Sequence, residues 1–107
     1  MTEVTWSIPV AGYRFKGPLE YTKDLLERKG VFLVVCRVAG KYYLIDVDHA
    51  DNIKKSILYH ERQHYWREYK RGKLMYAVLY LEDSKPGYIQ KVEAEIRNIY
   101  KSIPCKP

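Results

Sequence analysis

The segment HERQH, which begins at His60, has the residue types and spacing of a zinc-peptidase motif. On a helix, His60 and His64 would lie one turn apart and could bind zinc, with Glu61 as the general base. Such a site also needs a third protein ligand and a largely uncharged helix, whereas Arg62 and Gln63 fill the variable positions and basic residues continue on both sides. The composition of the segment argues against a peptidase, although this alternative stays open.

A basic segment with interleaved aromatic residues runs from Lys54 to Lys73. It holds seven basic residues against two glutamates, and so most of the net charge of +6. Cations that neutralise phosphates, alternating with rings that stack on bases or sugars, are typical of a nucleic-acid-binding surface. The alternative is a solvated helix face whose rings point into the core. The residues expected to contact nucleic acid are Lys54, Lys55, Arg62, Arg67, Lys70 and Arg71, and the interleaved rings are Tyr59, Tyr65, Trp66 and Tyr69.

The strands that must position these residues follow from the hydrophobic pattern. Residues 31–38 are rich in β-branched residues and apolar on both alternating faces, which predicts a central strand covered on both sides. Residues 42–47 return after a short turn as an antiparallel partner, and residues 74–81 are expected as a third strand. On the second strand, Tyr42 is expected to share a face with Asp46, and Tyr43 to point to the opposite face.

Three helices are expected around this sheet. The first covers residues 21–29, with Thr22 as its N-cap and Gly30 as its stop. The second is capped by Asp51 and runs from residue 52 to about residue 69, with a break near His64. The third follows the turn at residues 84–87, and its apolar stripe has the spacing of a core-facing surface, namely Ile89, Val92, Ile96, Ile99 and Ile103.

The sequence therefore predicts an α+β domain with a small three-stranded antiparallel sheet flanked by helices. Its 107 residues support one domain over residues 1–107, with residues 1–20 as an irregular or edge-strand lead-in. Cys36 lies in an apolar run and Cys105 in the tail, which suggests a buried and a free thiol in a reducing compartment. Because no apolar segment approaches the roughly 20 residues that span a bilayer, a cytoplasmic protein without a membrane partner is expected.

In the order and spacing of its elements the chain resembles the GIY-YIG nuclease superfamily over about residues 29–104. The signature of that family is a Gly-Ile-Tyr strand, a Tyr-Ile-Gly strand, an Arg-x-x-x-His helix and a late glutamate. Here GVF opens the first strand at Gly30, DVD closes the second at Asp46, and a helical segment leads to His60. Glu93 follows on the last helix. The resemblance implies the α+β fold given above, with nuclease-like topology.

What the resemblance implies for the site can be given position by position. In the family, a tyrosine activates water, the arginine contacts the scissile phosphate, the histidine assists near the nucleophile, and the glutamate holds one divalent metal. The histidine and the glutamate are retained here, which implies Mg²⁺ or Mn²⁺ at Glu93 if catalysis survives. At the other positions, Phe32 cannot shuttle a proton and Ser56 cannot neutralise a phosphate. Asp46 and Asp48 would repel a phosphate at this site. The residues at the catalytic positions are Phe32, Asp46, Ser56, His60 and Glu93.

Three hypotheses about function follow. The leading one is a nucleic-acid-binding, non-catalytic domain derived from a nuclease, with DNA rather than RNA as the expected partner. The second is an active divalent-metal-dependent endonuclease with a remodelled site, in which Asp46 and Glu93 hold the metal together. The third is a protein-interaction module that keeps only the fold. The first two require His60 and Glu93 to face one cleft, while a hydrogen-bonded His60 and an ion pair between Glu93 and Arg97 are the alternatives.

Overall fold

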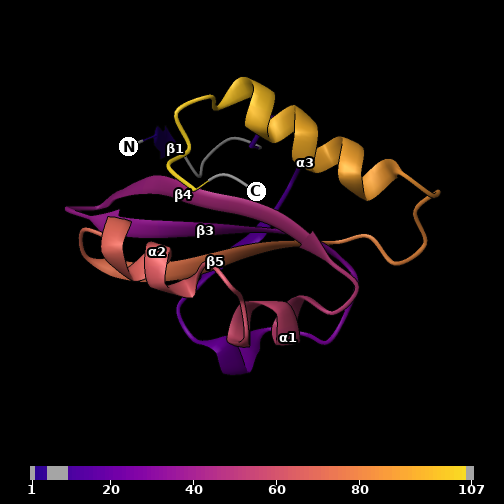
Figure 1. Cartoon of the computed structure of the whole chain (residues 1–107), viewed down its shortest axis with the longest axis horizontal. Coiled ribbons are helices and arrows are strands. Elements are labelled where there is room, and N and C mark those ends of the chain that lie inside the picture. Colours follow the sequence, from indigo (N-terminus) through magenta and orange to yellow (C-terminus); the bar gives the residue numbers. More distant parts are fainter. Residues whose placement is uncertain (1, 5–9, 106–107) are drawn as a thin grey trace.

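An antiparallel sheet with helices on both faces organises the chain, as the computed structural model shows (Figure 1). The structure describes residues 2–4 and 10–105, and side chains from residue 10 onward. The elements are β1 (Thr2–Val4), β2 (Lys16–Leu19), a 3₁₀ turn (Thr22–Asp24), β3 (Gly30–Val38), β4 (Lys41–Ala50), α1 (Ile53–Leu58), α2 (Gln63–Tyr69), β5 (Lys73–Tyr80) and α3 (Tyr88–Ile99).

The sheet has the strand order β1-β4-β3-β5-β2, and each neighbouring pair is antiparallel. The α+β class is confirmed, and the three strands expected from the sequence are the three central ones. The described part of the sheet has five strands rather than three, because short segments of the N-terminal lead-in pair at both edges. Of that lead-in, residues 1 and 5–9 lie outside the described residues.

Strand β3 lies at the centre because its side chains are apolar in both directions. Every residue from Val31 to Cys36 is buried. Side chains on one face join the core under α3, and those on the other face join the core under α1 and α2. Figure 1 shows α3 on one side of the sheet and the two short helices on the other. The continuous apolar run therefore predicted the strand correctly.

Strand β4 contains a β-bulge that changes which residues share a face. Val34 pairs with Asp46 and Val35 pairs with Leu44, so Ile45 is the extra residue. Ile45 and Tyr43 contact the core under α1 and α2, the side to which Asp46 also turns, whereas Tyr42 packs on the α3 side. The expectation that Tyr42 shares a face with Asp46 was wrong, because a bulge reverses the alternation of side chains.

The long helix expected over residues 52–69 is two short helices, with His60 in the link between them. Trp66 follows Ile57 by nine residues, and each residue of a helix turns the chain by about 100°. On one straight helix the two side chains would therefore point to opposite sides. The break allows both to be buried against the sheet. The side chain of Gln63 donates to the carbonyls of residues 57 and 58, 2.6 and 2.7 Å away, and so satisfies the end of α1. Asn52, not Asp51, caps α1 by accepting from the N–H of Lys55.

The helix expected over residues 21–29 is only the 3₁₀ turn. Leu25 is the single buried residue of this segment, so no apolar stripe holds a helix against the sheet. Gly30 does not end a helix but begins β3. A Cβ at this position would lie 2.0 Å from the carbonyl oxygen of Leu79 on the neighbouring strand β5, so close strand pairing requires glycine here.

The last helix was predicted correctly, and α3 buries Ile89, Val92 and Ile96. The stripe ends earlier than expected, since Ile99 is 58% exposed and Ile103 is buried after the helix has ended. No helix in the described part of the chain has the length and apolar character needed to cross a membrane.

Candidate functional site at the edge of strand β4

The second half of β4 has an open outer edge. Strand β1 pairs with β4 only at residues 42–44, so the backbone groups beyond this point need other partners. The carboxylate of Asp46 accepts the N–H of Val47 at 2.9 Å, and that of Asp48 accepts the N–H of His49 at 2.8 Å. Arg97 donates to the carbonyl of Val47. Side chains therefore take the place of a neighbouring strand.

Asp46 is fully buried and is the centre of a charged network. Its Oδ2 accepts from Arg62 Nε and Trp66 Nε1, both at 2.8 Å, and its Oδ1 accepts from Arg97 Nη2 at 3.0 Å. Burial would lower the pKa of Arg62, but the hydrogen bond and charge of Asp46 and the charge of Asp48 outweigh it and raise this pKa. The network thus holds the start of α2 and the side of α3 against β4.

His60 is buried in the link between α1 and α2 and uses both ring nitrogens. Its side chain is 5% exposed. Nε2 lies 2.7 Å from Asp48 Oδ2, and Nδ1 accepts the backbone N–H of Arg62 at 3.1 Å. Because Nδ1 accepts, the proton that His60 shares with Asp48 is on Nε2. The ring also packs edge-on against Phe32, with centroids 5.9 Å apart, and lies against Trp66. His60 therefore has a structural role here.

The carboxylate of Asp48 is held in its charged form. Burial would raise its pKa, but the hydrogen bonds from His60 and the N–H of His49, together with the charge of Arg62, lower it to about 2. Arg62 Nη2 lies 3.1 Å from Asp48 Oδ2. At neutral pH this aspartate is an acceptor only, and it cannot act as a general acid.

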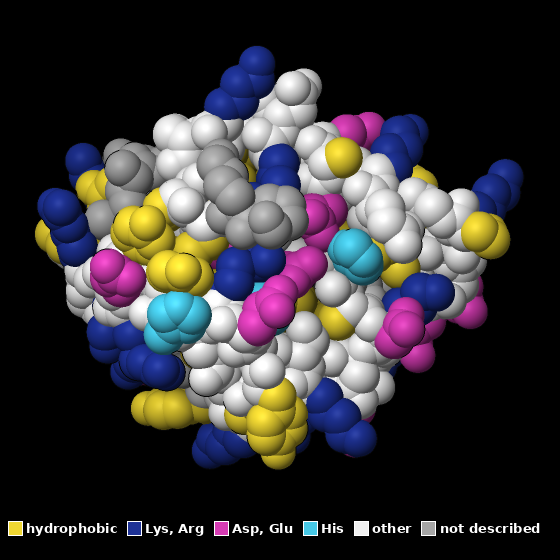
Figure 2. All heavy atoms as spheres, in the orientation of Figure 1, with side chains coloured by type: hydrophobic (Ala, Val, Ile, Leu, Met, Phe, Trp, Pro, Cys, Tyr) yellow, Lys and Arg dark blue, Asp and Glu magenta, His cyan; other side chains and the backbone are white. Residues whose placement is uncertain are grey.

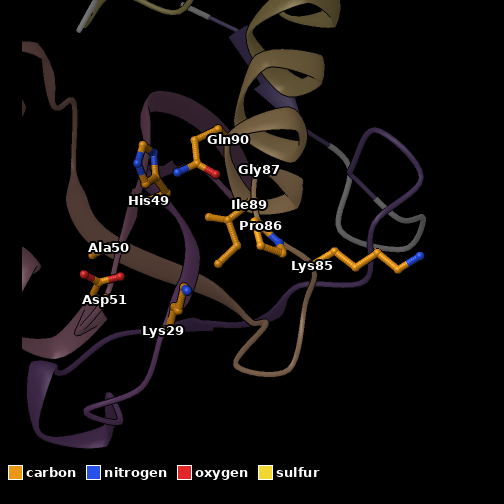
Figure 3. Close-up of a pocket in the computed structure, with 9 residues that line it drawn as sticks. All are labelled: Lys29, His49, Ala50, Asp51, Lys85, Pro86, Gly87, Ile89 and Gln90. Carbon is orange, nitrogen blue, oxygen red and sulfur yellow. The ribbon is translucent and has the colours of Figure 1, made fainter.

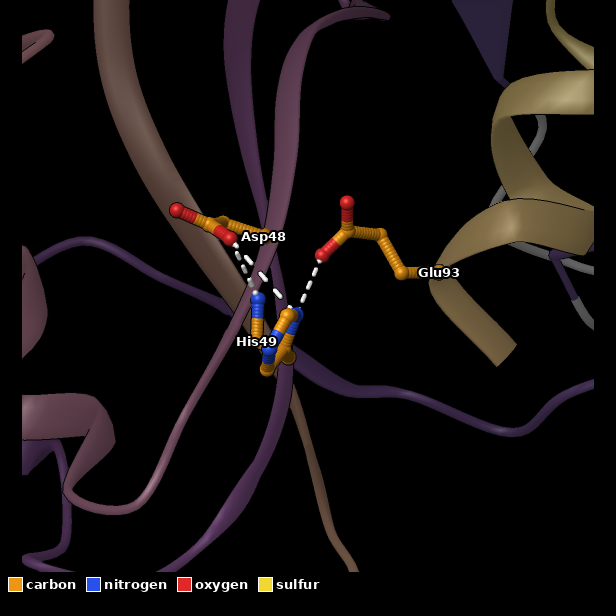
Figure 4. A group of neighbouring side chains, drawn as sticks. All are labelled: Asp48, His49 and Glu93. Carbon is orange, nitrogen blue, oxygen red and sulfur yellow. Dashed lines mark hydrogen bonds and ion pairs between the residues drawn. The ribbon is translucent and has the colours of Figure 1, made fainter. Parts of the chain in front are cut away.

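Glu93 lies on the other face of the sheet and contacts the next residue of β4. Its Oε1 is 2.6 Å from His49 Nδ1 (Figure 4). Its Oε2 is 3.4 Å from Arg97 Nε. The ion pair between Glu93 and Arg97 was one of the expected alternatives. Ligand atoms of Asp48, His49 and Glu93 all lie within 4.8 Å of one another, and no other group of three histidine, cysteine or acidic residues in the described chain does so.

The residues expected to form one site are only partly brought together. Phe32, Asp46 and His60 cluster on the face covered by α1 and α2, and Ser56 lines a shallow groove there with Asp48 and His60. Glu93 reaches the strand from α3, on the opposite face. His60 and Glu93 have no contact in the described structure, because Asp48 lies between them: its Oδ2 is 2.7 Å from His60 Nε2, and its carboxylate lies in one group with Glu93.

The expected metal pair of Asp46 and Glu93 is also not formed. The guanidinium of Arg97 lies between the two carboxylates and contacts both, so a cation of the protein already bridges them. The zinc-peptidase geometry is absent too. His60 is in the link between the helices, while His64 is exposed on α2 and packs against the ring of Tyr65.

The outer side of α1 and α2 carries the remaining basic residues. Arg62 is not available to a partner, since it is buried in the network, and its assignment as a nucleic-acid contact was wrong. None of the other five has an ion pair within the described structure, and together with the tyrosines they define the basic face. Figure 2 shows Lys and Arg side chains alternating with hydrophobic ones along the lower side of the view. The basic face comprises Lys54, Lys55, Arg67, Lys70 and Arg71 with Tyr59, Tyr65 and Tyr69.

Two contributors to the edge of β4 were missed by sequence reasoning. His49 follows an Asp-Val-Asp strand end, and an Asp-His pair at that place is the signal that could have identified it. Arg97 was noticed only as a partner of Glu93, while its contact with Asp46 depends on how α3 crosses the edge of the sheet. The imidazole of His49 also lines a pocket of about 270 Å³ between the end of β4 and the start of α3 (Figure 3).

Comparison with protein-family models gave no match, and neither the curated proteins nor the solved structures matched the chain. The GIY-YIG resemblance stays a prediction from the sequence.

Proposed function

We propose that the protein is a non-catalytic nucleic-acid-binding domain that attaches through the basic face on α1 and α2. The observation that carries the proposal is the combination, on one side of the molecule, of exposed tyrosine rings with cations that have no ion pair among the described residues. Tyr59 is 82% exposed, and Tyr65 and Tyr69 are 44% and 41% exposed. When Lys and Arg side chains neutralise phosphates, the counterions condensed on the nucleic acid are released, and this release favours binding. Exposed aromatic rings can stack on unpaired bases.

Five of the cations outside the basic face are paired within the chain. Arg28, Lys73 and Lys91 each lie beside a glutamate, and Arg62 and Arg97 lie beside buried or half-buried carboxylates. Their charges are largely neutralised within the chain. The basic face holds five cations with Glu61 and Glu68 as the nearby opposing charges, so it presents a positive field to a polyanion.

The state of the expected catalytic residues supports a non-catalytic role. Phe32 is buried and has no proton to transfer. Asp46 and His60 have their acceptor and donor atoms engaged by neighbouring side chains and backbone. A general base needs a free acceptor within reach of the substrate. These residues support the structure rather than chemistry on a phosphodiester.

The test is binding of fluorescently labelled oligonucleotides, measured by anisotropy at several salt concentrations. We expect the affinity for single-stranded and duplex DNA to fall linearly with the logarithm of salt concentration. The double variant Arg67→Ala/Lys70→Ala should bind roughly tenfold or more weakly, with a salt slope reduced by about 2. An RNA oligonucleotide of the same sequence tests the preference for DNA.

The matched control removes two positive charges on the opposite side of the molecule. Arg14 follows Tyr13, whose hydroxyl bonds to Glu95 of α3, and Lys91 lies on α3 itself. The variant Arg14→Ala/Lys91→Ala should bind like the wild type. Equal losses in both double variants, or no binding at low salt, would contradict the proposal. Cleavage of DNA with Mg²⁺ or Mn²⁺ that is lost in Glu93→Ala would instead favour the nuclease hypothesis.

A further inference from the structure

We propose that Asp48, His49 and Glu93 form a binding site for a first-row transition metal ion, with Zn²⁺ as the preferred ion. The site differs from the single glutamate ligand implied by the family resemblance, because it adds an imidazole and a second carboxylate. It lies where α3 crosses the open edge of β4 (Figure 4). Its three ligands are not among the residues that define the basic face, so zinc binding can be tested without nucleic acid.

The three ligand atoms come from elements whose positions are fixed by other contacts. Asp48 and His49 pair with Phe32 and Val31 in the sheet, and α3 is held by its buried isoleucine and valine side chains. His49 Nδ1 lies 2.6 Å from Glu93 Oε1 and 3.8 Å from Asp48 Oδ1. Ligands at about 2.0–2.1 Å around a tetrahedral ion are roughly 3.3 Å apart. These two distances bracket that value, and the ligand oxygens of Asp48 and Glu93 lie within 4.8 Å of each other. Side-chain shifts would bring the three atoms onto one ion.

The arrangement around the two carboxylates also fits a metal site. Asp48 directs Oδ2 to His60 and Arg62, while its Oδ1 lies on the side of His49, where it accepts the backbone N–H of that residue and keeps a second lone pair. Glu93 directs Oε2 to Arg97, which leaves Oε1 beside the imidazole. Each carboxylate thus has one oxygen held by a cation or imidazole and the other turned into the group. Such outer partners orient carboxylate ligands in metal sites.

The donor set indicates the class of metal. An imidazole nitrogen favours zinc and other later transition metals over Mg²⁺ and Ca²⁺, which prefer oxygen ligands alone. Two carboxylates match the charge of a divalent ion. The ion would take the place of the proton that His49 and Glu93 now share. Water would complete the coordination, and the pocket beside His49 gives a path for it (Figure 3).

The test is titration of the chelator-treated protein with Zn²⁺ by calorimetry, without nucleic acid present. We expect one Zn²⁺ per chain, with Mg²⁺ binding more weakly. Glu93→Gln keeps the size of the side chain but removes the anionic oxygen, and His49→Ala removes the nitrogen ligand. Each variant should bind roughly tenfold or more weakly. Because the ligands join β4 and α3, Zn²⁺ should also raise the melting temperature of the wild type, and much less that of either variant.

The control is His64→Ala, which removes the exposed histidine of the HERQH segment and should bind Zn²⁺ like the wild type. Circular dichroism of each metal-free variant confirms that it is folded before titration, and Glu93→Gln serves as the main variant if His49→Ala unfolds. Absence of stoichiometric Zn²⁺ binding would overturn the proposal. Unchanged binding in Glu93→Gln, loss of binding in His64→Ala, or a preference for Mg²⁺ would overturn it as well.

Discussion

Arg62 and Arg67 are separated by little more than one helical turn, yet they belong to two regions in which charged side chains have different surroundings. At the edge of β4, Arg62 is buried and its guanidinium contacts two carboxylates. On the basic face, Arg67 is exposed and has no ion pair in the described structure. The first region neutralises its charges within the chain, and the second leaves them to the solvent.

The difference shows how burial decides what a charge can do. Taking an ion out of water costs several kcal/mol, and this cost is offset only when geometry and hydrogen bonds are nearly complete. The edge network meets this condition, since Asp46 has three side-chain donors and the described chain has no buried side-chain N or O atom without a partner. Such charges fix the position of α2 and α3. Exposed cations contribute little to stability, and in our proposal they attract the nucleic acid.

Asp46→Asn should produce the largest change in stability. The substitution keeps the size of the side chain but removes the charge that faces two guanidinium groups, which leaves buried cations uncompensated. We expect the free energy of unfolding to fall by about 3–5 kcal/mol, measured by urea denaturation. The matched control is Asp83→Asn, because Asp83 is exposed in the turn before α3. A similar loss in both variants would remove the distinction between buried and exposed charges.

The thiol of Cys105 offers a test of the buried region at alkaline pH. Burial and the charge of Asp46 raise its pKa from 9.0 to about 11. Above about pH 9 the unfolded chain loses this proton first, so the stabilisation is complete at lower pH and is lost as the pH rises toward 11. The loss over this window should be about 2 kcal/mol. Urea denaturation at a series of pH values measures it.

The comparison for this prediction is Cys105→Ala, which has no thiol to ionise. Its free energy of unfolding should depend less steeply on pH between about 9 and 11 than that of the wild type. Tyr13, whose pKa the hydrogen bond to Glu95 and burial raise to about 12, contributes equally in both proteins. Parallel pH profiles for the two proteins would mean that Cys105 is not held in its neutral form.

On the basic face, Tyr59→Ala should weaken binding to single-stranded DNA without a loss of stability. The ring is 82% exposed, so its removal leaves no cavity. Stacking of one base on an aromatic ring is worth about 1–3 kcal/mol, and the affinity should fall accordingly in the anisotropy assay. Tyr88→Ala on α3 is the control, since Tyr88 lies on the far side of the sheet. Unchanged affinity in Tyr59→Ala would restrict the basic face to contacts with phosphates.

Much of the central sheet could be predicted because its signals are local. The apolar run from Val31 to Cys36 is long enough to identify a strand buried on both faces. The break between α1 and α2 was expected near His64, but α1 already ends at Leu58. The interruption is needed because Ile57 and Trp66 would lie on opposite sides of one continuous helix, and both face the sheet. The bulge at Ile45 has no comparable local pattern. The bulge arises from the register in which β4 pairs with β3, and the sequence of β4 alone does not determine this register.

The candidate site could be predicted less well, for a related reason. Asp46, His60 and Glu93 were singled out by their types and order, but the face from which each reaches β4 depends on tertiary packing. Arg97 contacts Asp46 across 51 positions of sequence, and His49 meets Glu93 across 44. Both contacts depend on where α3 crosses the strand. Residue types identified the participants, and only the fold determined their partners.

The smallest effect is expected for Lys91→Ala on α3. Lys91 Nζ lies 3.8 Å from Glu95 Oε1, with the two side chains 67% and 42% exposed. Water screens such a pair, and holding two long side chains together costs entropy, so the free energy of unfolding should change by less than about 0.5 kcal/mol. Urea denaturation beside Asp46→Asn gives the direct comparison. A loss approaching that of Asp46→Asn would mean that exposure does not separate the two kinds of ion pair in this protein, and Lys91 could no longer serve in the control for DNA binding.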